Sequence, residues 1–179
     1  SAEYYRITDY LYFNQPDKND STAIVPAQYG GTISMFKFTL GKKFTYGKFN
    51  LESYVVYQKT SNATVMPTPD FYTFNSFYID QKVFKVLKTN IGFDVRYNTK
   101  YNNYAYNPAI SQFYVGKGVK FDTTPIIDLW IRASLRKANI FVKYEYVNQG
   151  IGSQGYYTVY KYPMPDKLLK VGLSWNFYD

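Results

Sequence analysis

Cysteine and histidine are both absent from this sequence of 179 residues. Without cysteine, the chain has no disulfide framework and no thiolate metal site. Without histidine, it lacks the commonest general base and the commonest metal ligand, which excludes acyl-hydrolase triads built on histidine. We therefore expect a protein that is not an enzyme and that uses no metal or cofactor.

Long hydrophobic runs are absent as well. The uninterrupted apolar stretches span only a few residues, whereas a membrane-spanning helix needs about 18–20. Charged residues make up 19% of the chain and aromatic residues 21%, including 22 Tyr and 14 Phe. The first residues, SAEYYRITDY, lack the basic and apolar regions of a secretory leader. We expect a processed mature chain or a portion of a longer protein.

The sequence is rich in regular alternation of apolar and polar side chains. In LLKVGLSWNFYD, every second residue from Leu169 to Phe177 is large and apolar. This period of two is typical of a β-strand with two different faces. The pattern predicts one all-β domain over residues 1–179 with eight strands. They lie near 4–13, 31–41, 46–59, 71–83, 88–101, 125–136, 138–147 and 167–178.

The connections between these strands are alternately short and long. Short turns are predicted at KKFTY, FKVL and RKAN. The long connections span 14–30, 60–70, 102–124 and 148–166. Tight turns at one end of a sheet and long loops at the other are the plan of an antiparallel up-and-down transmembrane β-barrel. An even number of strands then places both chain ends on the periplasmic side.

Three features indicate that the apolar face of this barrel lies against lipid. The polar face carries small, bulky and oppositely charged side chains, which suit an enclosed lumen. Tyrosines near strand ends suit an interfacial girdle as well as ordinary β-propensity. They are Tyr57, Tyr97, Tyr144, Tyr146 and Tyr178. The short turns are predicted to carry cations without carboxylates, which favours lipid phosphates over a nucleic-acid groove. These cations are Lys42, Lys43, Lys82, Lys85, Lys88, Arg136 and Lys137.

The last part of the chain resembles a known family. ANIFVKYEYVNQG, followed by YYTVYKYPMPDKLLKVGLSWNFYD, is similar to the putative porin family of Bacteroidetes-type outer membranes, in which a Tyr-Pro-Met-Pro turn leads into the last strand. The similarity is strongest over residues 125–179. The last strand also looks like the C-terminal assembly signal of outer-membrane barrels, carried here by Leu173, Trp175 and Phe177. Two further residues, Tyr178 and Asp179, follow the aromatic residue on which such proteins usually stop.

The resemblance implies a bacterial outer-membrane location and three kinds of partner. These are outer-membrane lipids with lipopolysaccharide, the barrel-assembly machinery during biogenesis, and small hydrophilic solutes. It identifies neither an oligomeric state nor a partner protein for the external loops. Family members are usually several times longer than this chain, so we expect the eight strands to be the C-terminal part of a larger barrel. The alternative is a complete, narrow barrel whose interior is nearly filled by side chains.

Six charged residues on the predicted polar face form the candidate site. They are Asp94, Arg96, Asp128, Arg132, Lys143 and Glu145. Each carboxylate lies two or four residues from a cation on the same strand face, which favours a structural or selectivity role over catalysis. We hypothesise that these charges form a transverse field that biases which small solutes pass or bind, as charged rings do in pores.

The sequence therefore predicts a porin-like barrel through which small hydrophilic solutes diffuse passively. Two alternatives remain open. In a soluble ligand-binding barrel the apolar face would line the pocket, and in a plugged structural or docking barrel the external loops would bind partners. A lysine at Leu129 or Val142 separates the first two, because it is costly only against lipid. Conductance separates the porin from the plugged barrel.

Overall fold

The protein folds into β-strands throughout the part of the chain that the structure describes. This computed structural model covers residues 1–17, 23–121, 123–135, 137–151 and 157–177. Within these ranges there is no helix with the length and hydropathy needed to cross a bilayer. The strands are β1 (Ala2–Asn14), β2 (Val25–Tyr46), β3 (Phe49–Thr60), β4 (Phe71–Val83), β5 (Leu87–Asn98), β6 (Asn102–Asn107), β7 (Gln112–Lys120), β8 (Ile126–Leu135), β9 (Ala138–Glu145), β10 (Tyr157–Val159), β11 (Tyr162–Pro163) and β12 (Leu168–Trp175).

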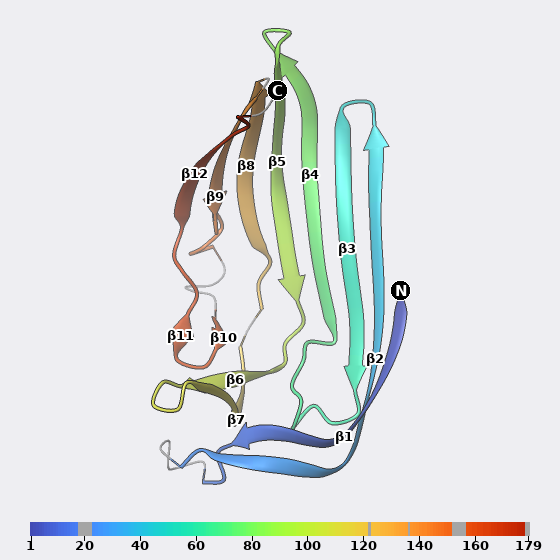
Figure 1. Cartoon of the computed structure of the whole chain (residues 1–179), viewed down its shortest axis with the longest axis vertical. Coiled ribbons are helices and arrows are strands. Elements are labelled where there is room, and N and C mark those ends of the chain that lie inside the picture. Colours follow the sequence, from blue (N-terminus) through green and yellow to red (C-terminus); the bar gives the residue numbers. More distant parts are fainter. Residues whose placement is uncertain (18–22, 122, 136, 152–156, 178–179) are drawn as a thin grey trace.

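Ten of these strands form a single sheet with the order β12-β9-β8-β5-β4-β3-β2-β1-β7-β6 (Figure 1). The first eight in this order match the eight predicted strands, and neighbours among them pair antiparallel. The predicted all-β, up-and-down arrangement is therefore confirmed. Across the described residues β12 does not pair with β1, so the sheet is open, consistent with part of a barrel.

Short turns join these strands at one end of the sheet, which we call the short-turn end. β2 continues to Tyr46, which lies opposite Phe49, so the first turn is Gly47–Lys48 rather than the predicted KKFTY. Gly47 has a φ of 59°, a conformation that glycine adopts without steric cost. The next turn joins β4 to β5 at the predicted FKVL stretch.

The cations predicted for the short turns are only partly where they were expected. Lys42 and Lys43 lie within β2 rather than in a turn. Lys43 forms an ion pair with Glu52 of β3 at 3.1 Å, so the prediction that places Lys42 and Lys43 in a short turn is wrong. Arg136 lies outside the described residues.

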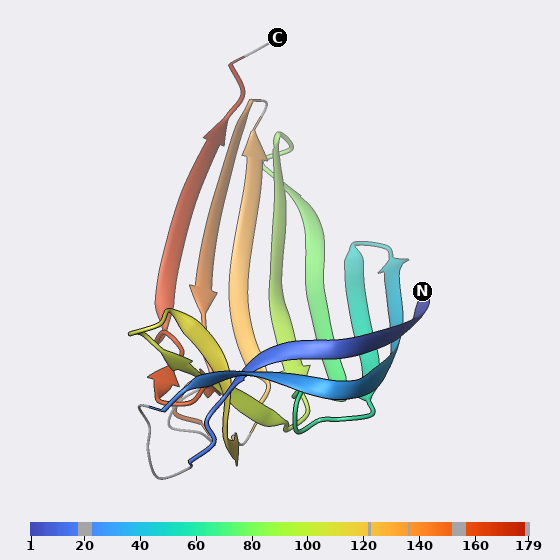
Figure 2. The ribbon, with the colours of Figure 1, turned by 60° about the horizontal axis from the view of Figure 1, so that its bottom comes forward.

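The opposite end of the sheet, the loop end, contains more strand than predicted. β6 and β7 form a hairpin within the connection 102–124, and β10 and β11 form another within 148–166. β7 joins the sheet by pairing parallel with β1, and a bridge from Ala105 to Tyr160 links β6 to the residue after β10. Figure 2 shows β1, β6 and β7 crossing this end.

An apolar core lies at the loop end. Ile33 of β2 is fully buried and packs against Val65 and Met66 from the β3–β4 connection. β1 and β2 also change register here, at a bulge between Thr8 and Tyr10. Bulges bend a strand pair and increase its twist. The loop end therefore contains a small cluster of buried apolar side chains around Ile33.

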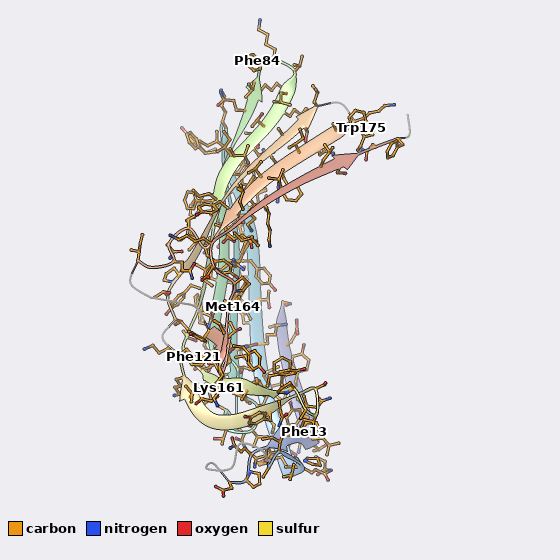
Figure 3. The ribbon with its side chains drawn as sticks, turned by 90° about the vertical axis from the view of Figure 1, so that its left-hand side faces the viewer. Phe13, Phe84, Phe121, Lys161, Met164 and Trp175 are labelled. Atoms are coloured by element: carbon orange, nitrogen blue, oxygen red, sulfur yellow. The ribbon has the colours of Figure 1, made fainter. Side chains whose placement is uncertain are left out.

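The two faces of the sheet between these ends differ in exposure. On β8, Leu129 and Ile131 are 48% and 46% exposed, whereas the intervening Asp128 and Trp130 are 0% and 7% exposed. We call the side carrying Leu129 the apolar face and the side carrying Asp128 the polar face. A soluble sheet would bury the former and expose the latter. Figure 3 shows the side chains of both faces between the two ends.

Candidate functional site: a charged cluster on the polar face

The candidate site is built from neighbouring strands whose pairing places two carboxylates side by side. Asp94 of β5 lies directly opposite Asp128 of β8, and Ser76 of β4 lies opposite Asp94 on its other side. Directly paired residues share one face of a sheet, so all three side chains belong to the polar face. Two carboxylates in such a position repel each other unless cations lie between them.

Asp128 is the centre of the cluster. Its Oδ2 atom accepts a hydrogen bond from Arg96 Nη2 at 2.8 Å and lies 3.0 Å from Lys143 Nζ. Its Oδ1 atom accepts the Tyr146 backbone N–H at 3.0 Å. A buried ion is costly unless opposite charge and hydrogen bonds compensate for lost water, and Asp128 has both.

Tyr146 lies beside this carboxylate rather than on the apolar face. It follows β9 with a φ of 57°, and its side chain is buried. The Arg96 guanidinium carbon lies 5.7 Å from the centre of its ring. The predicted place of Tyr146 in an exposed girdle is therefore wrong, because the left-handed backbone turns this residue out of the strand alternation.

Asp94 is held by neutral donors as well as by a cation. Ser76 Oγ and Trp130 Nε1 both donate to its Oδ1 atom at 2.7 Å. Lys143 Nζ lies 3.3 Å from Asp94 Oδ2 and thus contacts both opposed carboxylates. A single ammonium group therefore stabilises the pair.

Glu145 extends the cluster to the last strand. Lys143 Nζ lies 3.8 Å from one Glu145 oxygen, and Lys170 Nζ of β12 lies 2.7 Å from the other. Sequence reasoning missed Lys170, although its alternation with apolar neighbours on the last strand could have found it. We define the charged cluster as Asp94, Arg96, Asp128, Lys143, Glu145 and Lys170.

Arg132, which was predicted to belong to this group, lies apart from it. Its guanidinium carbon lies 4.7 Å from the centre of a Trp130 ring, a cation–π contact. A Cβ added at Gly92 would clash with the Phe77 carbonyl oxygen and come within 2.9 Å of the Trp130 ring. Glycine at this position therefore makes room for the indole, which in turn supports Arg132.

The arrangement of these charges favours an electrostatic role over catalysis or metal binding. Each carboxylate of the charged cluster contacts at least one cation. Carboxylates occupied in this way are poorly placed to accept a substrate proton. In the described ranges, no group of three or more carboxylates is arranged to hold a metal ion. Fixed charges held along one face set up a local electrostatic field at that face.

The residues of the predicted assembly signal lie on and just after β12. They are Leu173, Trp175 and Phe177, and all are exposed. Figure 3 shows Trp175 at the same end of the sheet as Phe84, which lies in the β4–β5 turn. Tyr57 and Tyr144 of the predicted girdle are also exposed, whereas Tyr178 lies outside the described residues.

Comparison with known proteins identifies the family of this chain. A sequence profile of the family described as "Putative porin" matches residues 1–179, which is the whole chain. No curated protein and no solved structure matches it. The open antiparallel sheet, with its exposed apolar face, agrees with the family assignment. The chain therefore belongs to the putative porin family.

Proposed function

We propose that this sheet forms part of the wall of an outer-membrane barrel through which small hydrophilic solutes diffuse passively. The observation that supports this function is the contrast between the two faces of the same strands. Leu129 is half exposed, whereas its neighbour Asp128 is completely buried among cations. A bilayer solvates the apolar face, and a polar lumen contains the charged cluster.

The same contrast defines the other contacts that we propose. The apolar face contacts lipid, and Lys82, Lys85 and Lys88 near the β4–β5 turn reach the phosphates of lipids at that rim. The terminal residues Leu173, Trp175 and Phe177 contact the barrel-assembly machinery during biogenesis. The charged cluster and Arg132 set the selectivity of the lumen for small ions.

A plugged structural or docking barrel is the second candidate. The observation that favours it is the pairing of β1 with β7 and the bridge between Ala105 and Tyr160, which carry backbone across the loop end (Figure 2). In such a barrel the loop-end hairpins bind a partner, and solutes do not pass.

Liposome swelling tests the proposed function. The intact protein is extracted from the outer-membrane fraction with detergent and reconstituted, and swelling is measured in neutral sugars of increasing size. Passive diffusion predicts swelling that slows as the sugars become larger. Folded protein that causes no swelling supports the plugged barrel instead. Protein that leaves the membrane fraction without detergent contradicts both and supports a soluble ligand-binding barrel.

Ion selectivity tests the role of the charges. Neutralising Arg96 and Arg132 together with Arg96→Gln and Arg132→Gln should shift the reversal potential toward cation preference. The matched control is Lys59→Gln, because Lys59 lies opposite Phe36, on the apolar face. An unchanged reversal potential in the double variant contradicts the selectivity role.

A further inference from the structure

A hollow of about 310 Å³ lies beside the charged cluster on the polar face. Side chains from five strands, β2, β3, β4, β5 and β8, line it. Its charged lining residues are Lys43 and Glu52, which form an ion pair with each other, Asp94, which pairs with Lys143, and Asp80 and Arg132. Tyr78, Asn90 and Trp130 line it as well. Asp80 and Arg132 carry opposite charges and form no ion pair within the described part of the chain, so these two residues decide what the hollow can bind.

Arg132 presents an oriented cation to this hollow. Trp130 lies under its guanidinium group, and the indole is itself fixed because its Nε1–H donates to Asp94. Among the described residues, Arg132 makes no ion pair and no hydrogen bond, and it is exposed. Its planar fork of N–H donors is therefore available to a carboxylate.

Asp80 presents the opposite charge. Its Oδ2 atom accepts a hydrogen bond from Asn50 Nδ2 at 2.8 Å, and its Oδ1 atom accepts one from Asn90 Nδ2. Within the described part of the chain, no cation lies at ion-pair distance from this carboxylate. Two neutral amides thus orient Asp80 without an ion pair, although Lys48, Lys82 and Lys88 line a neighbouring hollow with it. The remaining lone pairs of Asp80 suit an ammonium group.

The register of the sheet sets the distance between these two charges. Asn90 of β5 lies directly opposite both Asp80 of β4 and Arg132 of β8. Adjacent strands lie about 4.8 Å apart, so the two Cα atoms lie about 10 Å apart, in one row on one face. A solute with a carboxylate and an ammonium group on the same carbon fits between side chains that reach toward it from both ends of this row.

We propose that this hollow is a binding subsite for free α-amino acids. The Arg132 guanidinium binds the carboxylate, Asp80 binds the ammonium group, and the rings of Tyr78 and Trp130 contact the side chain. A solute of one charge would satisfy one end of the row and be repelled by the other, whereas a zwitterion satisfies both. This proposal names a class of solute for the proposed pore. Its physiological use rests on the proposed function, because the subsite serves transport only if the lumen is open.

Binding of L-alanine and of lactate to the intact, detergent-solubilised protein tests the subsite directly by calorimetry. Lactate has the carboxylate of alanine but a hydroxyl in place of its ammonium group. We expect alanine to bind about tenfold more tightly than lactate, the difference expected for one lost charged contact. Arg132→Gln should weaken alanine binding about tenfold, and Asp80→Asn should abolish the preference for alanine over lactate.

Matched controls separate this effect from a general change of charge. Lys37→Gln removes a cation that pairs with Glu3 at 3.8 Å, and Asp70→Asn removes a carboxylate that pairs with Lys59. Neither residue lines the hollow, so both variants should bind alanine like the native protein. Equal binding of alanine and lactate, or unchanged preference in Asp80→Asn, overturns the subsite.

Glycerol flux into liposomes distinguishes failure of the subsite from failure of the pore. Glycerol is small and neutral, so its flux depends on an open lumen and not on Asp80 or Arg132. Glycerol flux without alanine binding overturns the subsite and leaves the pore. Alanine binding without glycerol flux supports the subsite and contradicts passive diffusion.

Discussion

The two faces of the sheet are stabilised in different ways, although they alternate along the same strands. On the apolar face, side chains such as Phe77 and Phe93 stack at 5.1 Å but remain exposed. On the polar face, Asp94 and Asp128 are buried and receive bonds from several strands. The stability of the apolar face depends on the medium that surrounds it, whereas the stability of the polar face depends on specific ion pairs and hydrogen bonds.

This difference indicates where the chain tolerates change. A residue of the exposed apolar face can be exchanged for another apolar residue of similar size, because dispersion contacts are not directional. Exchange of a single member of the charged cluster is costly, because its partners lose part of their compensating charge.

Removing the charge of Asp128 should have the largest effect. Asp128→Asn leaves the Arg96 and Lys143 cations facing a neutral amide, and breaking a buried pair costs about 3–5 kcal/mol. Urea unfolding of the reconstituted protein measures this loss. The control is Asp70→Asn, whose exposed pair with Lys59 contributes about 1 kcal/mol or less. Equal losses in the two variants would show that the cluster is not buried in the folded protein.

A charge on the apolar face should have the next largest effect. Leu129→Lys should lower the free energy of unfolding by about 2–4 kcal/mol in a bilayer if the residue lies near the midplane. The matched control is Asn139→Lys, because Asn139 lies opposite Ser134 and Ser174 on the polar face. The same cost for both lysines would contradict a lipid-facing apolar side.

A methyl group at Gly92 tests how tightly the polar face is packed. Gly92→Ala forces a Cβ against the Phe77 carbonyl and the Trp130 ring, and such overpacking costs about 1–3 kcal/mol. We also expect the tryptophan fluorescence to change as Trp130 shifts. Gly30→Ala is the control, because a Cβ at Gly30 meets nothing within 4 Å. Native fluorescence in Gly92→Ala would contradict the packing described for Trp130.

The stability of the loop end should fall only at alkaline pH, so this effect is the smallest of the four near neutral pH. Burial raises the pKa of Tyr104 in β6 to about 12, from an ordinary value of 10.0. Because the folded pKa is raised, the stabilising contribution is complete below pH 10 and is lost as the pH approaches 12. Phenolate absorbance should show a late titration step that Tyr104→Phe removes. If Tyr104→Phe instead removed part of the step at the ordinary pKa and left the late step unchanged, the result would contradict the burial of this phenol.

The alternation of side chains was enough to predict the wall of the sheet. In stretches such as IIDLWIRASLR, apolar residues recur at every second position. This alternation predicts both the presence of a strand and the face on which each side chain lies. β6, β10 and β11 were missed because they have only six, three and two residues, and β7 was missed because Gly116 and Gly118 interrupt its apolar pattern. They are strands because β6 pairs with β7 and β10 pairs with β11 in local hairpins, whose register the alternation of side chains does not show.

Five of the six residues of the charged cluster were named from the sequence, but Lys170 and the geometry of the cluster were not. Alternation placed Asp94, Asp128 and Lys143 on one face, as observed. Lys143 contacts both carboxylates because of the register between neighbouring strands. That register cannot be predicted from the sequence of one strand. Arg132 was grouped with them by charge, but the indole of Trp130 provides a competing position for its guanidinium.

The contacts that close the loop end have a consequence for the order of folding. Hairpins such as β2–β3 and β4–β5 join neighbours in the sequence, so each closes a short loop at small entropic cost. The pairing of Asn14 with Val115, and of Ala105 with Tyr160, joins segments far apart in the sequence, and such non-local contacts form slowly. We expect the wall to assemble hairpin by hairpin while this end is still open, and the crossing segments to settle over it last.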